Sequence, residues 1–344
     1  MSNQKKAPIR FSPLDGLFKG RQGVLFGLFL LFVLFLGVFP FLPFASGFWL
    51  NTLTLILLLA AMSIGWNFIG GYTGYAAFGN VAFFGIGAYG TGLSMTRLGL
   101  SFFPALLIGA ASAMIFAILI GLPILRLKGH YFAIATVAIA TALGEIADSW
   151  TSFTGGAAGI TLPFFDPIEW SGQFFYYMAY LLAMGGLFLT WFILNRKMGY
   201  SWVAIREDED AANMMGINTT WAKVMAFALS ALMAGLAGGI YAYWKTFVLA
   251  EEVFKIEYTL QMILAAVLGG TGTIFGPFIG AFIYYILITL LVFFLPVGQL
   301  HATILGSIII LVMVFTPKGL MDFIIGRKKL SINALMENIR TYKV

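Results

Sequence analysis

The chain has 344 residues, of which 60% are hydrophobic, 17% aromatic and only 10% charged. This composition excludes an ordinary soluble enzyme and is typical of a polytopic membrane protein. The formal net charge is +6, there is no cysteine and only two histidines occur, so disulfides are excluded and we expect no metal, no cofactor and no nucleic-acid partner.

Apolar stretches that approach membrane-crossing length recur along the whole chain. A helix needs about 20 predominantly apolar residues to cross the bilayer core. The stretches lie near residues 24–44, 48–69, 76–96, 104–125, 131–150, 173–194, 223–244, 259–274, 277–295 and 301–316. We therefore predict an all-α polytopic membrane protein with about ten transmembrane helices.

The same stretches divide the chain into three parts. Residues 1–23 are expected to form an N-terminal tail and residues 317–344 a C-terminal tail. Residues 24–316 are expected to form the transmembrane domain, which includes one long polar interval at 195–223.

The charged residues predict which side of the membrane each loop occupies. Basic loops remain in the cytoplasm. If the N-terminus is cytoplasmic, all of the 20 lysines and arginines fall on the cytoplasmic side except Arg97, Lys245 and Lys255. The segments 145–172 and 245–258, which are then external, hold many of the acidic residues. Both termini are therefore predicted to be cytoplasmic.

Two glycine-rich regions interrupt the third and eighth stretches. They cover residues 70–80 and 269–277, and further glycines continue from the first region to Gly92. Each glycine inside a helix costs nearly 1 kcal/mol relative to alanine, so we expect broken or tightly packed helices. Breaks at membrane depth often line a translocation path, whereas small-residue faces also serve close helix packing. The sequence leaves both interpretations open.

The polar interval holds five consecutive charged residues, 206–210, which cannot lie in hydrocarbon. Asp208 is suited to cap a short helix, and Gly216 is suited to end it in the left-handed conformation. One face of this helix would carry Ala211, Ala212 and Met215. A surface helix lying on lipid headgroups would be basic. Because this segment is acidic, we favour a protein partner that receives the helix in a groove.

Catalytic and energy-coupling motifs are missing from the chain. No Gly-x4-Gly-Lys-Ser/Thr sequence occurs, so the chain has no phosphate-binding loop for ATP. Glu145 and Asp148 are the ionisable pair within a predicted span, where they would serve either as a wetted interfacial pair or as a site for a coupling ion. Nothing places a nucleophile beside a base, and an enzyme is not expected.

Several motifs together resemble one family. Asp-Ala-Ala-x3-Gly at 210–216 is similar to the Glu-Ala-Ala-x3-Gly coupling loop of ABC-importer permeases, with Asp for Glu and without the later Ile-x-Leu-Pro. Other segments resemble the permease subunits of branched-chain and neutral amino acid ABC importers, in particular the larger of the two related permeases. They are Gly-Tyr-Thr-Gly at 71–74, Phe-Phe-Gly-Ile-Gly-Ala-Tyr at 83–89, Arg-Leu-Lys-Gly-His-Tyr-Phe-Ala-Ile-Ala-Thr at 126–136, Gly-Gly-Ala-Ala-Gly-Ile at 155–160, Ala-Gly-Leu-Ala-Gly at 234–238 and Leu-Gly-Gly-Thr-Gly-Thr at 268–273.

The resemblance implies a non-catalytic permease subunit in a bacterial inner membrane, with glycine-broken spans that open alternately to each side. Its implied partners are a second related permease, two cytoplasmic ABC ATPases, an external solute-binding protein and membrane lipid. The implied coupling residues are Arg206, Glu207, Asp208, Asp210, Ala211, Ala212, Met215 and Gly216. The implied substrate is a branched-chain or other neutral amino acid; alternatives are urea or a short amide, or a stand-alone ion-coupled carrier.

Aromatic and short polar side chains beside the first glycine region are candidates to line the substrate path, because they can hold a small zwitterion or amide transiently. They are Tyr72, Thr73, Tyr75, Phe78 and Asn80. Ordinary packing within the bundle is the alternative for each of them. Asn80 stands where many relatives carry His or Gln, which leaves the substrate class open.

Overall fold

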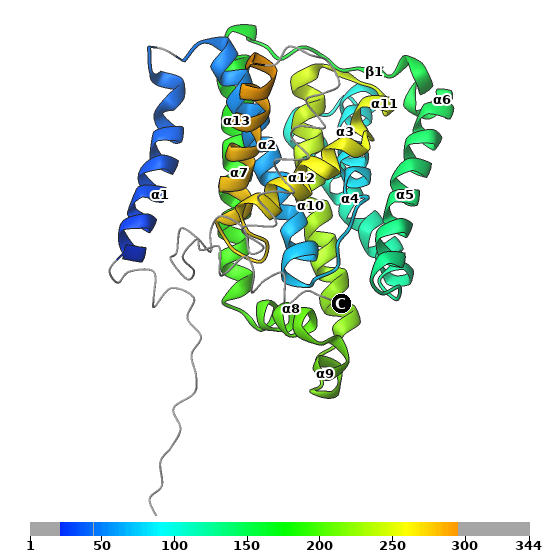
Figure 1. Ribbon diagram of the computed structural model, residues 1–344. Coiled ribbons are helices and arrows are strands. Elements are labelled where there is room, and N and C mark those ends of the chain that lie inside the picture. The colour runs from blue at the N-terminus through cyan, green and yellow to red at the C-terminus, as the bar shows by residue number, and fades with distance from the viewer. Residues whose placement is uncertain (1–20, 44, 295–344) are drawn as a thin grey trace, which may run out of the picture. The chain divides into compact units, whose positions relative to one another are not determined.

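The computed structural model describes residues 21–43 and 45–294 (Figure 1). The first helix, α1 (Arg21–Val38), and the 3-10 turn η1 (Phe39–Phe41) belong to a unit that ends at Leu42. Within this unit the apolar side chains of α1 are largely exposed, for example Leu31 and Leu34. An exposed apolar helix of this kind is suited to lipid.

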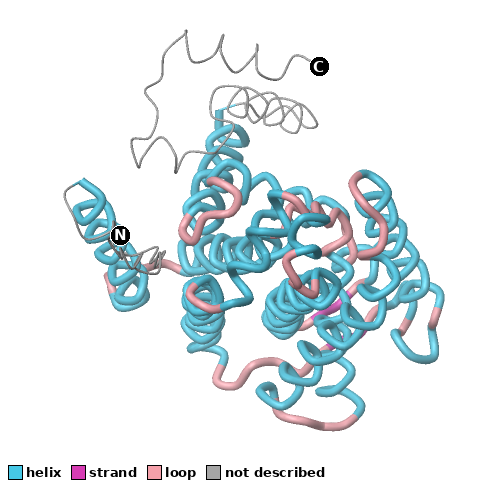
Figure 2. The backbone as a smooth tube through the Cα atoms, turned by 90° about the horizontal axis from the view of Figure 1, so that it is seen from below, coloured by secondary structure: helices cyan, strands magenta, loops and turns pink. Residues whose placement is uncertain are grey.

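The second unit is a bundle of long helices with short polar elements at its ends. The long helices are α2 (Gly47–Asn67), α3 (Val81–Arg97), α4 (Phe102–Ile124), α5 (His130–Ser149), α7 (Ser171–Leu194), α10 (Thr219–Lys245), α12 (Ile256–Gly269) and α13 (Gly276–Phe294). The short elements are η2 (Phe68–Tyr72), α6 (Thr151–Thr154), η3 (Gly156–Ala158), β1 (Ile160–Thr161), η4 (Ile168–Trp170), α8 (Lys197–Glu207), α9 (Glu209–Met214), β2 (Phe247–Val248) and α11 (Ala250–Val253). Figure 2 shows that most of the described chain is helical, with a single short pair of strands.

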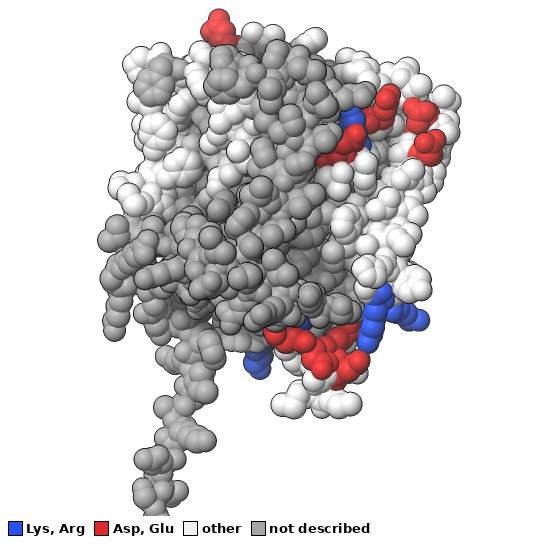
Figure 3. Space-filling view, viewed as in Figure 1, with Lys and Arg blue, Asp and Glu red and all other residues white. Residues whose placement is uncertain are grey.

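Five helical segments of the described chain are long and apolar enough to cross a membrane. They are Gly47–Tyr72, Phe102–Ile124, His130–Ser149, Ile168–Leu194 and Thr219–Lys245, and shorter apolar helices cover Phe26–Phe41 and Gly276–Leu290. In Figure 3 the charged side chains of the described face gather at the two ends of the molecule, with an uncharged band between them. The predicted all-α polytopic membrane fold is confirmed. The predicted tenth span at 301–316, the C-terminal tail and residues 1–20 of the N-terminal tail lie outside the described residues, whereas residues 21–23 of that tail already belong to α1.

Helix α10 is the central helix of the bundle, and it packs mainly against α3 and α4. The contact between α10 and α3 is close because both helices carry glycine there. A Cβ atom on Gly87 would lie 2.4 Å from the Cα atom of Gly235, and a Cβ on Gly238 would lie 2.0 Å from the carbonyl oxygen of Phe84. The glycines within α3 therefore serve close helix packing, which was one of the two interpretations that the sequence left open.

The first glycine region is a true break in the helical structure. After the π-helical turn η2 the chain runs without regular structure until α3 begins at Val81, so the predicted third span at 76–96 begins later than expected. Side chains satisfy the backbone of the break: Trp66 Nε1 donates to the carbonyl of Ala77 at 2.7 Å, and Phe78 N donates to Thr136 Oγ1 at 3.0 Å. Irregular backbone at membrane depth requires such partners.

The second glycine region likewise separates two helices. Helix α12 has 14 residues and ends at Gly269, and α13 begins at Gly276. Gly270 and Gly272 in the connection have φ angles of +124° and +71°, which other residues rarely adopt. The predicted eighth span at 259–274 is therefore shorter than expected at its C-terminal end.

The two ends of the bundle carry different short elements. Helices α8 and α9 lie at the lower end in Figure 1, whereas the strands, α6 and α11 lie at the upper end. At the upper end β1 pairs antiparallel with β2, with Ile160 opposite Val248. Since α10 begins beside α9 and ends beside β2, it connects the two ends through the core.

Candidate functional site: the junction beneath the helix breaks

The polar interval folds into two helices, α8 and α9, at one end of the bundle. Asp208 separates them and caps α9: its Oδ1 accepts hydrogen bonds from the backbone N–H groups of Asp210 and Ala211, at 2.9 and 3.0 Å. Gly216 follows α9 with a φ angle of +83°. The predicted short helix, its cap and its left-handed stop are therefore present, because each depends on local chemistry.

The side chains of α9 divide between the bundle and the solvent. Ala212 is 4% exposed and packs toward the bundle, whereas Met214 and Met215 are 88% and 84% exposed. Ala211 is also exposed. The three residues expected to share one face are thus separated, since Ala212 faces the bundle and Ala211 and Met215 do not. The exposed apolar surface at the tip of α9 consists of Met214 and Met215.

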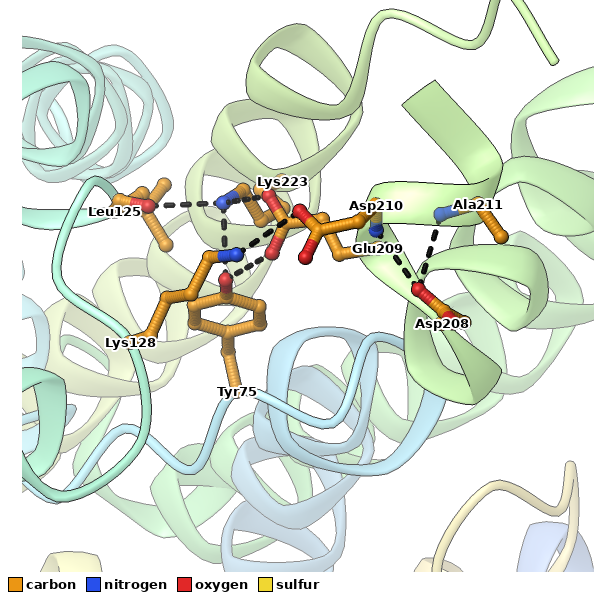
Figure 4. A network of polar contacts seen from close by, with 8 residues as sticks. All are labelled: Tyr75, Leu125, Lys128, Asp208, Glu209, Asp210, Ala211 and Lys223. Atoms are coloured by element: carbon orange, nitrogen blue, oxygen red, sulfur yellow. Dashed lines mark hydrogen bonds and ion pairs between the residues drawn. The ribbon is translucent and has the colours of Figure 1, made fainter. Parts of the chain in front are cut away.

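Lys223, in the first turns of α10, fastens α9 to the bundle (Figure 4). Its ammonium nitrogen lies 2.6 Å from Glu209 Oε1, 2.9 Å from the carbonyl oxygen of Leu125 and 3.1 Å from the Tyr75 hydroxyl. The Tyr75 hydroxyl in turn donates to the other oxygen of Glu209. The side chain of Lys223 is only 5% exposed, so a buried ammonium joins α9, the end of α4 and the first helix break. We call this contact of Tyr75, Leu125, Glu209 and Lys223 the junction.

This arrangement fixes the charge of Glu209. Burial raises the pKa of the Glu209 carboxyl, but the hydrogen bonds from Lys223 and Tyr75, together with the positive charges of Lys223 and Lys128, more than offset burial and hold that pKa below its usual value. Burial and the Glu209 carboxylate raise the pKa of the Tyr75 hydroxyl, so this hydroxyl stays protonated and can donate. Lys128 and Asp210 form a separate, exposed ion pair at 3.1 Å.

Arg206, in the last turn of α8, contacts the first helix break. Its Nη1 atom donates to the carbonyl oxygen of Gly71 at 3.0 Å. The breaks also bind each other through Asn67, whose amide nitrogen donates to the carbonyl of Thr273 at 3.0 Å while its amide oxygen accepts from Gly272 N at 2.8 Å. The two glycine regions, far apart in the chain, therefore meet at the end of the bundle that carries α8 and α9.

The five candidate path residues differ in their exposure. Tyr72, Thr73 and Asn80 are buried within the bundle, whereas Tyr75 and Phe78 are partly exposed. The Tyr72 ring lies 6.5 Å from the Trp202 ring in a stacked arrangement, and Asn80 Nδ2 donates to Ser230 Oγ at 2.9 Å. These contacts are those of packed residues, so any role in lining a path stays a prediction.

The remaining sequence candidates are separated from this junction. Glu145 and Asp148 are exposed in the last turns of α5, near the opposite end of the bundle. Among the described residues no group of three or more His, Cys, Asp or Glu side chains could hold a metal ion. Glu209 and Lys223 were not identified from the sequence as a pair. Glu209 and Lys223 lie in different helices, because α9 ends between them. A helical repeat in the sequence therefore cannot reveal their contact.

A bundle of membrane-crossing helices with non-helical breaks, and a short helix fastened beneath them, defines a membrane permease component. The chain belongs to the family described as branched-chain amino acid transport system / permease component, whose model matches residues 48–315. It is thus a multi-pass membrane protein and a permease component of a transport system.

Individual relatives agree with the family match. The chain is 30% identical to the high-affinity branched-chain amino acid transport system permease protein LivM of Escherichia coli, over 89% of this chain and 77% of the relative. It is 29% identical to the protein of the same name in Salmonella typhimurium, over 86% and 74%. The autoinducer 2 import system permease protein LsrC of Yersinia pseudotuberculosis is 28% identical over 60% of this chain and 62% of the relative. No solved structure matches the chain.

Proposed function

We propose that this chain is the permease subunit of an ATP-driven ABC importer for branched-chain or other neutral amino acids. It would work in a bacterial inner membrane with a second related permease, two cytoplasmic ATPase subunits and an external solute-binding protein. Both termini and the end of the bundle that carries α9 would face the cytoplasm. The relatives with the widest coverage are named for branched-chain amino acid transport, which supports this substrate class over urea or a short amide.

The observation that carries the proposal is the junction of α9 with the helix breaks. An ATPase that moves α9 also moves Glu209, and the buried Lys223 and Tyr75 pass that displacement to the break that follows η2. Packed and hydrogen-bonded chains of this kind can couple distant sites when the elements have two arrangements. ATP binding and hydrolysis on the partner would then drive alternating access, with no chemistry on this chain.

The ion-coupled carrier is not favoured by the placement of its residues. A coupling site inside a membrane buries its ionisable groups within the bundle or in a water-filled cavity. Glu145 and Asp148 are instead exposed near the end of α5.

The test uses the tip of α9, because its side chains are exposed and their replacement leaves the fold intact. We expect the Met215→Glu variant to assemble in the membrane but to lose copurification of a P-loop ATPase, since a carboxylate would have to be desolvated in an apolar groove. Lys197→Glu is the control, because it places the same carboxylate at an exposed position at the far end of α8, with a change of two charge units against one for Met215→Glu. Copurification and leucine uptake are measured for both variants.

The two outcomes separate the hypotheses. Loss of ATPase and uptake in Met215→Glu alone supports an importer whose energy arrives through α9. Normal ATPase binding and uptake in Met215→Glu would remove α9 as the docking element. Solute uptake by the purified chain alone, driven by an ion gradient, would remove the importer proposal itself.

A further inference from the structure

Asn67, the last residue of α2, is a buried polar residue whose side chain binds the second helix break. Its exposed fraction is 1%. Its amide nitrogen donates to the carbonyl of Thr273 at 3.0 Å, and its amide oxygen accepts from the backbone N–H of Gly272 at 2.8 Å. We call these two hydrogen bonds the Asn67 bridge. They join positions that are 206 and 205 residues apart in the chain.

The Asn67 bridge requires an amide side chain. Asparagine carries one acceptor and one donor group side by side, and the backbone of the second break offers the matching donor and acceptor at consecutive residues. An aspartate at this position could not donate to Thr273. An apolar side chain would leave the N–H group of Gly272 and the carbonyl of Thr273 without their partner, which costs free energy in a partly buried position.

The backbones of the two breaks also lie against each other beside the Asn67 bridge. A Cβ atom on Gly71 would lie 1.8 Å from Asn67 Oδ1 and 2.7 Å from the backbone nitrogen of Gly272. Gly272 has a φ angle of +71°, which favours glycine there. Because this contact leaves no room for a side chain, a displacement of one break presses directly on the other.

The second break is tied closely to the helices on both sides of it. Thr273 Oγ1 donates to the carbonyl of Gly270 at 2.7 Å and accepts from the backbone nitrogen of Gly276 at 3.0 Å. A Cβ atom on Gly269, at the end of α12, would lie 1.7 Å from the carbonyl oxygen of Gly276, at the start of α13. The Asn67 bridge therefore holds the point at which α12 and α13 meet.

The first break connects the Asn67 bridge with the junction. The backbone nitrogen of Tyr75 and the hydroxyl of Thr73 both donate to the carbonyl of Ile69, at 3.1 and 2.6 Å. The turn that follows Asn67 is thus hydrogen-bonded internally, and it ends at Tyr75, whose hydroxyl belongs to the junction (Figure 4). A continuous series of contacts runs from α9 through the first break to Asn67 and the second break.

We propose that Asn67 is a positioning residue that makes the two helix breaks move as one unit, so that a displacement of α9 reaches α12 and α13. This inference deepens the proposed function and rests on it for the source of the displacement. The Asn67 bridge itself is a property of this chain alone. Without it the first break still follows α9, whereas the second break loses its hydrogen-bonded link to that movement.

Hydrogen exchange of the purified full chain in detergent tests the Asn67 bridge without any partner. The amide of Gly272 is protected by its bond to Asn67, so Asn67→Ala is expected to speed exchange there about tenfold. Asn51→Ala is the matched control, because it is the same substitution at an exposed position of the same helix. It is expected to leave exchange at Gly272 unchanged. Unchanged exchange in Asn67→Ala would overturn the proposal.

Cysteine labelling of the assembled complex, with and without ATP, tests the transmission. The chain has no cysteine, so Ala76→Cys in the first break and Thr271→Cys in the second each give it a single thiol at a partly exposed position. The rate of reaction with a water-soluble maleimide is read from the mass of this chain. With Asn67 present, we expect ATP to change the rate about fivefold or more at both positions. In Asn67→Ala only the Ala76→Cys position is expected to respond.

A milder variant serves if Asn67→Ala folds poorly. Asn67→Asp keeps the acceptor for the N–H group of Gly272 and loses only the donor for Thr273. It is expected to weaken the ATP response of the Thr271→Cys position and to leave that of the Ala76→Cys position unchanged. Asn51→Asp is its matched control and should weaken neither response.

The outcomes separate this inference from the importer proposal. A full response at the Thr271→Cys position in Asn67→Ala overturns the role of Asn67 and leaves the importer proposal standing. So does a response at the Ala76→Cys position alone when Asn67 is present, a result that needs no substitution at Asn67. If no ATPase accompanies the chain, the importer proposal fails together with transmission through Asn67, and exchange at Gly272 still decides whether the Asn67 bridge forms.

Discussion

Lys223 is the residue on which the junction depends most, because it is a nearly buried cation with three polar partners on three segments. Replacing it with methionine would remove the charge while keeping most of the side-chain volume. The Glu209 carboxylate would then remain partly buried with Tyr75 as its donor. Breaking a buried ion pair costs about 3–5 kcal/mol, and partial exposure of Glu209 reduces this to about 2–3 kcal/mol.

Thermal unfolding of Lys223→Met in detergent measures this loss. The matched control is Lys128→Met, the same substitution at an exposed lysine whose partner Asp210 is exposed as well. Exposed pairs contribute little, so the control is expected to unfold at the temperature of the unmodified chain. Equal stability of all three proteins would show that the buried pair does not hold the junction.

Because the pKa of Glu209 is lowered, the stabilisation by the Glu209–Lys223 ion pair depends on pH. Because the folded-state pKa lies below the ordinary value of 4.5, the unfolded chain binds more protons in the window between the two values. The stabilisation is therefore fully present above about pH 4.5 and is lost as pH falls through the folded-state pKa. Unfolding temperatures of the unmodified chain and Glu209→Gln should differ at neutral pH and converge in acid; a difference that stays constant into acid would contradict the ion pair.

At the scale of elements, the contact of α3 with α10 depends on glycine. A methyl group on Gly238 would lie 2.0 Å from the carbonyl oxygen of Phe84, a backbone atom that cannot turn away. We therefore expect Gly238→Ala to separate the helices and to lower stability by about 1–3 kcal/mol. Gly185→Ala on α7 is the control, since a Cβ there meets no atom within 4 Å and alanine favours the helix.

Unfolding in detergent and folded yield measure both glycine variants. Loss in Gly238→Ala together with an unchanged or more stable Gly185→Ala is expected. If Gly238→Ala is as stable as the unmodified chain, α3 and α10 can move apart at little cost, and the close approach would not be a requirement of the fold.

The elements also show what could be predicted from the sequence. Apolar length predicted the helices, and the local chemistry of Asp208 and Gly216 predicted where α9 begins and ends. The interruptions near Gly74 and Gly272 were predicted from glycine density, because glycine is unfavourable inside a helix. Both residues adopt positive φ angles, +77° and +71°. Each of these features depends on a few consecutive residues, so it can be predicted without knowing which other segment packs against them.

Features that depend on tertiary contacts were not predicted. Lys223 stands where an apolar stretch begins, and a lysine there is typical of a membrane boundary; only the fold brings Tyr75 to it. The buried positions of Tyr72 and Asn80 likewise follow from packing against Trp202 and Ser230. Polar residues beside a helix break can line a substrate path, or they can form hydrogen bonds with the backbone groups that the break leaves unpaired. The sequence does not distinguish these two uses.

At the scale of the whole molecule, Arg206 can separate two roles: binding of the ATPase, and transmission of its movement to the helix breaks. Arg206 belongs to the segment expected to meet the ATPase, yet its guanidinium binds the carbonyl of Gly71 in the first helix break. In the assembled importer we propose, Arg206→Gln should therefore still bind the ATPase. Its uptake per ATP hydrolysed should fall about tenfold, because a hydrogen bond from a charged donor that links the two parts is lost.

Leucine uptake and ATP hydrolysis, measured together in reconstituted vesicles, test this separation. Arg196→Gln is the control, because it is the same substitution at an exposed arginine at the start of α8 that is not among the implied coupling residues, so it is expected to leave the ratio unchanged. Met215→Glu should lose both activities with the ATPase, whereas Arg206→Gln should keep hydrolysis and lose uptake. If Arg206→Gln also loses the ATPase, Arg206 is part of the docking surface, and transmission to the helix breaks must depend on Lys223 and Tyr75 instead.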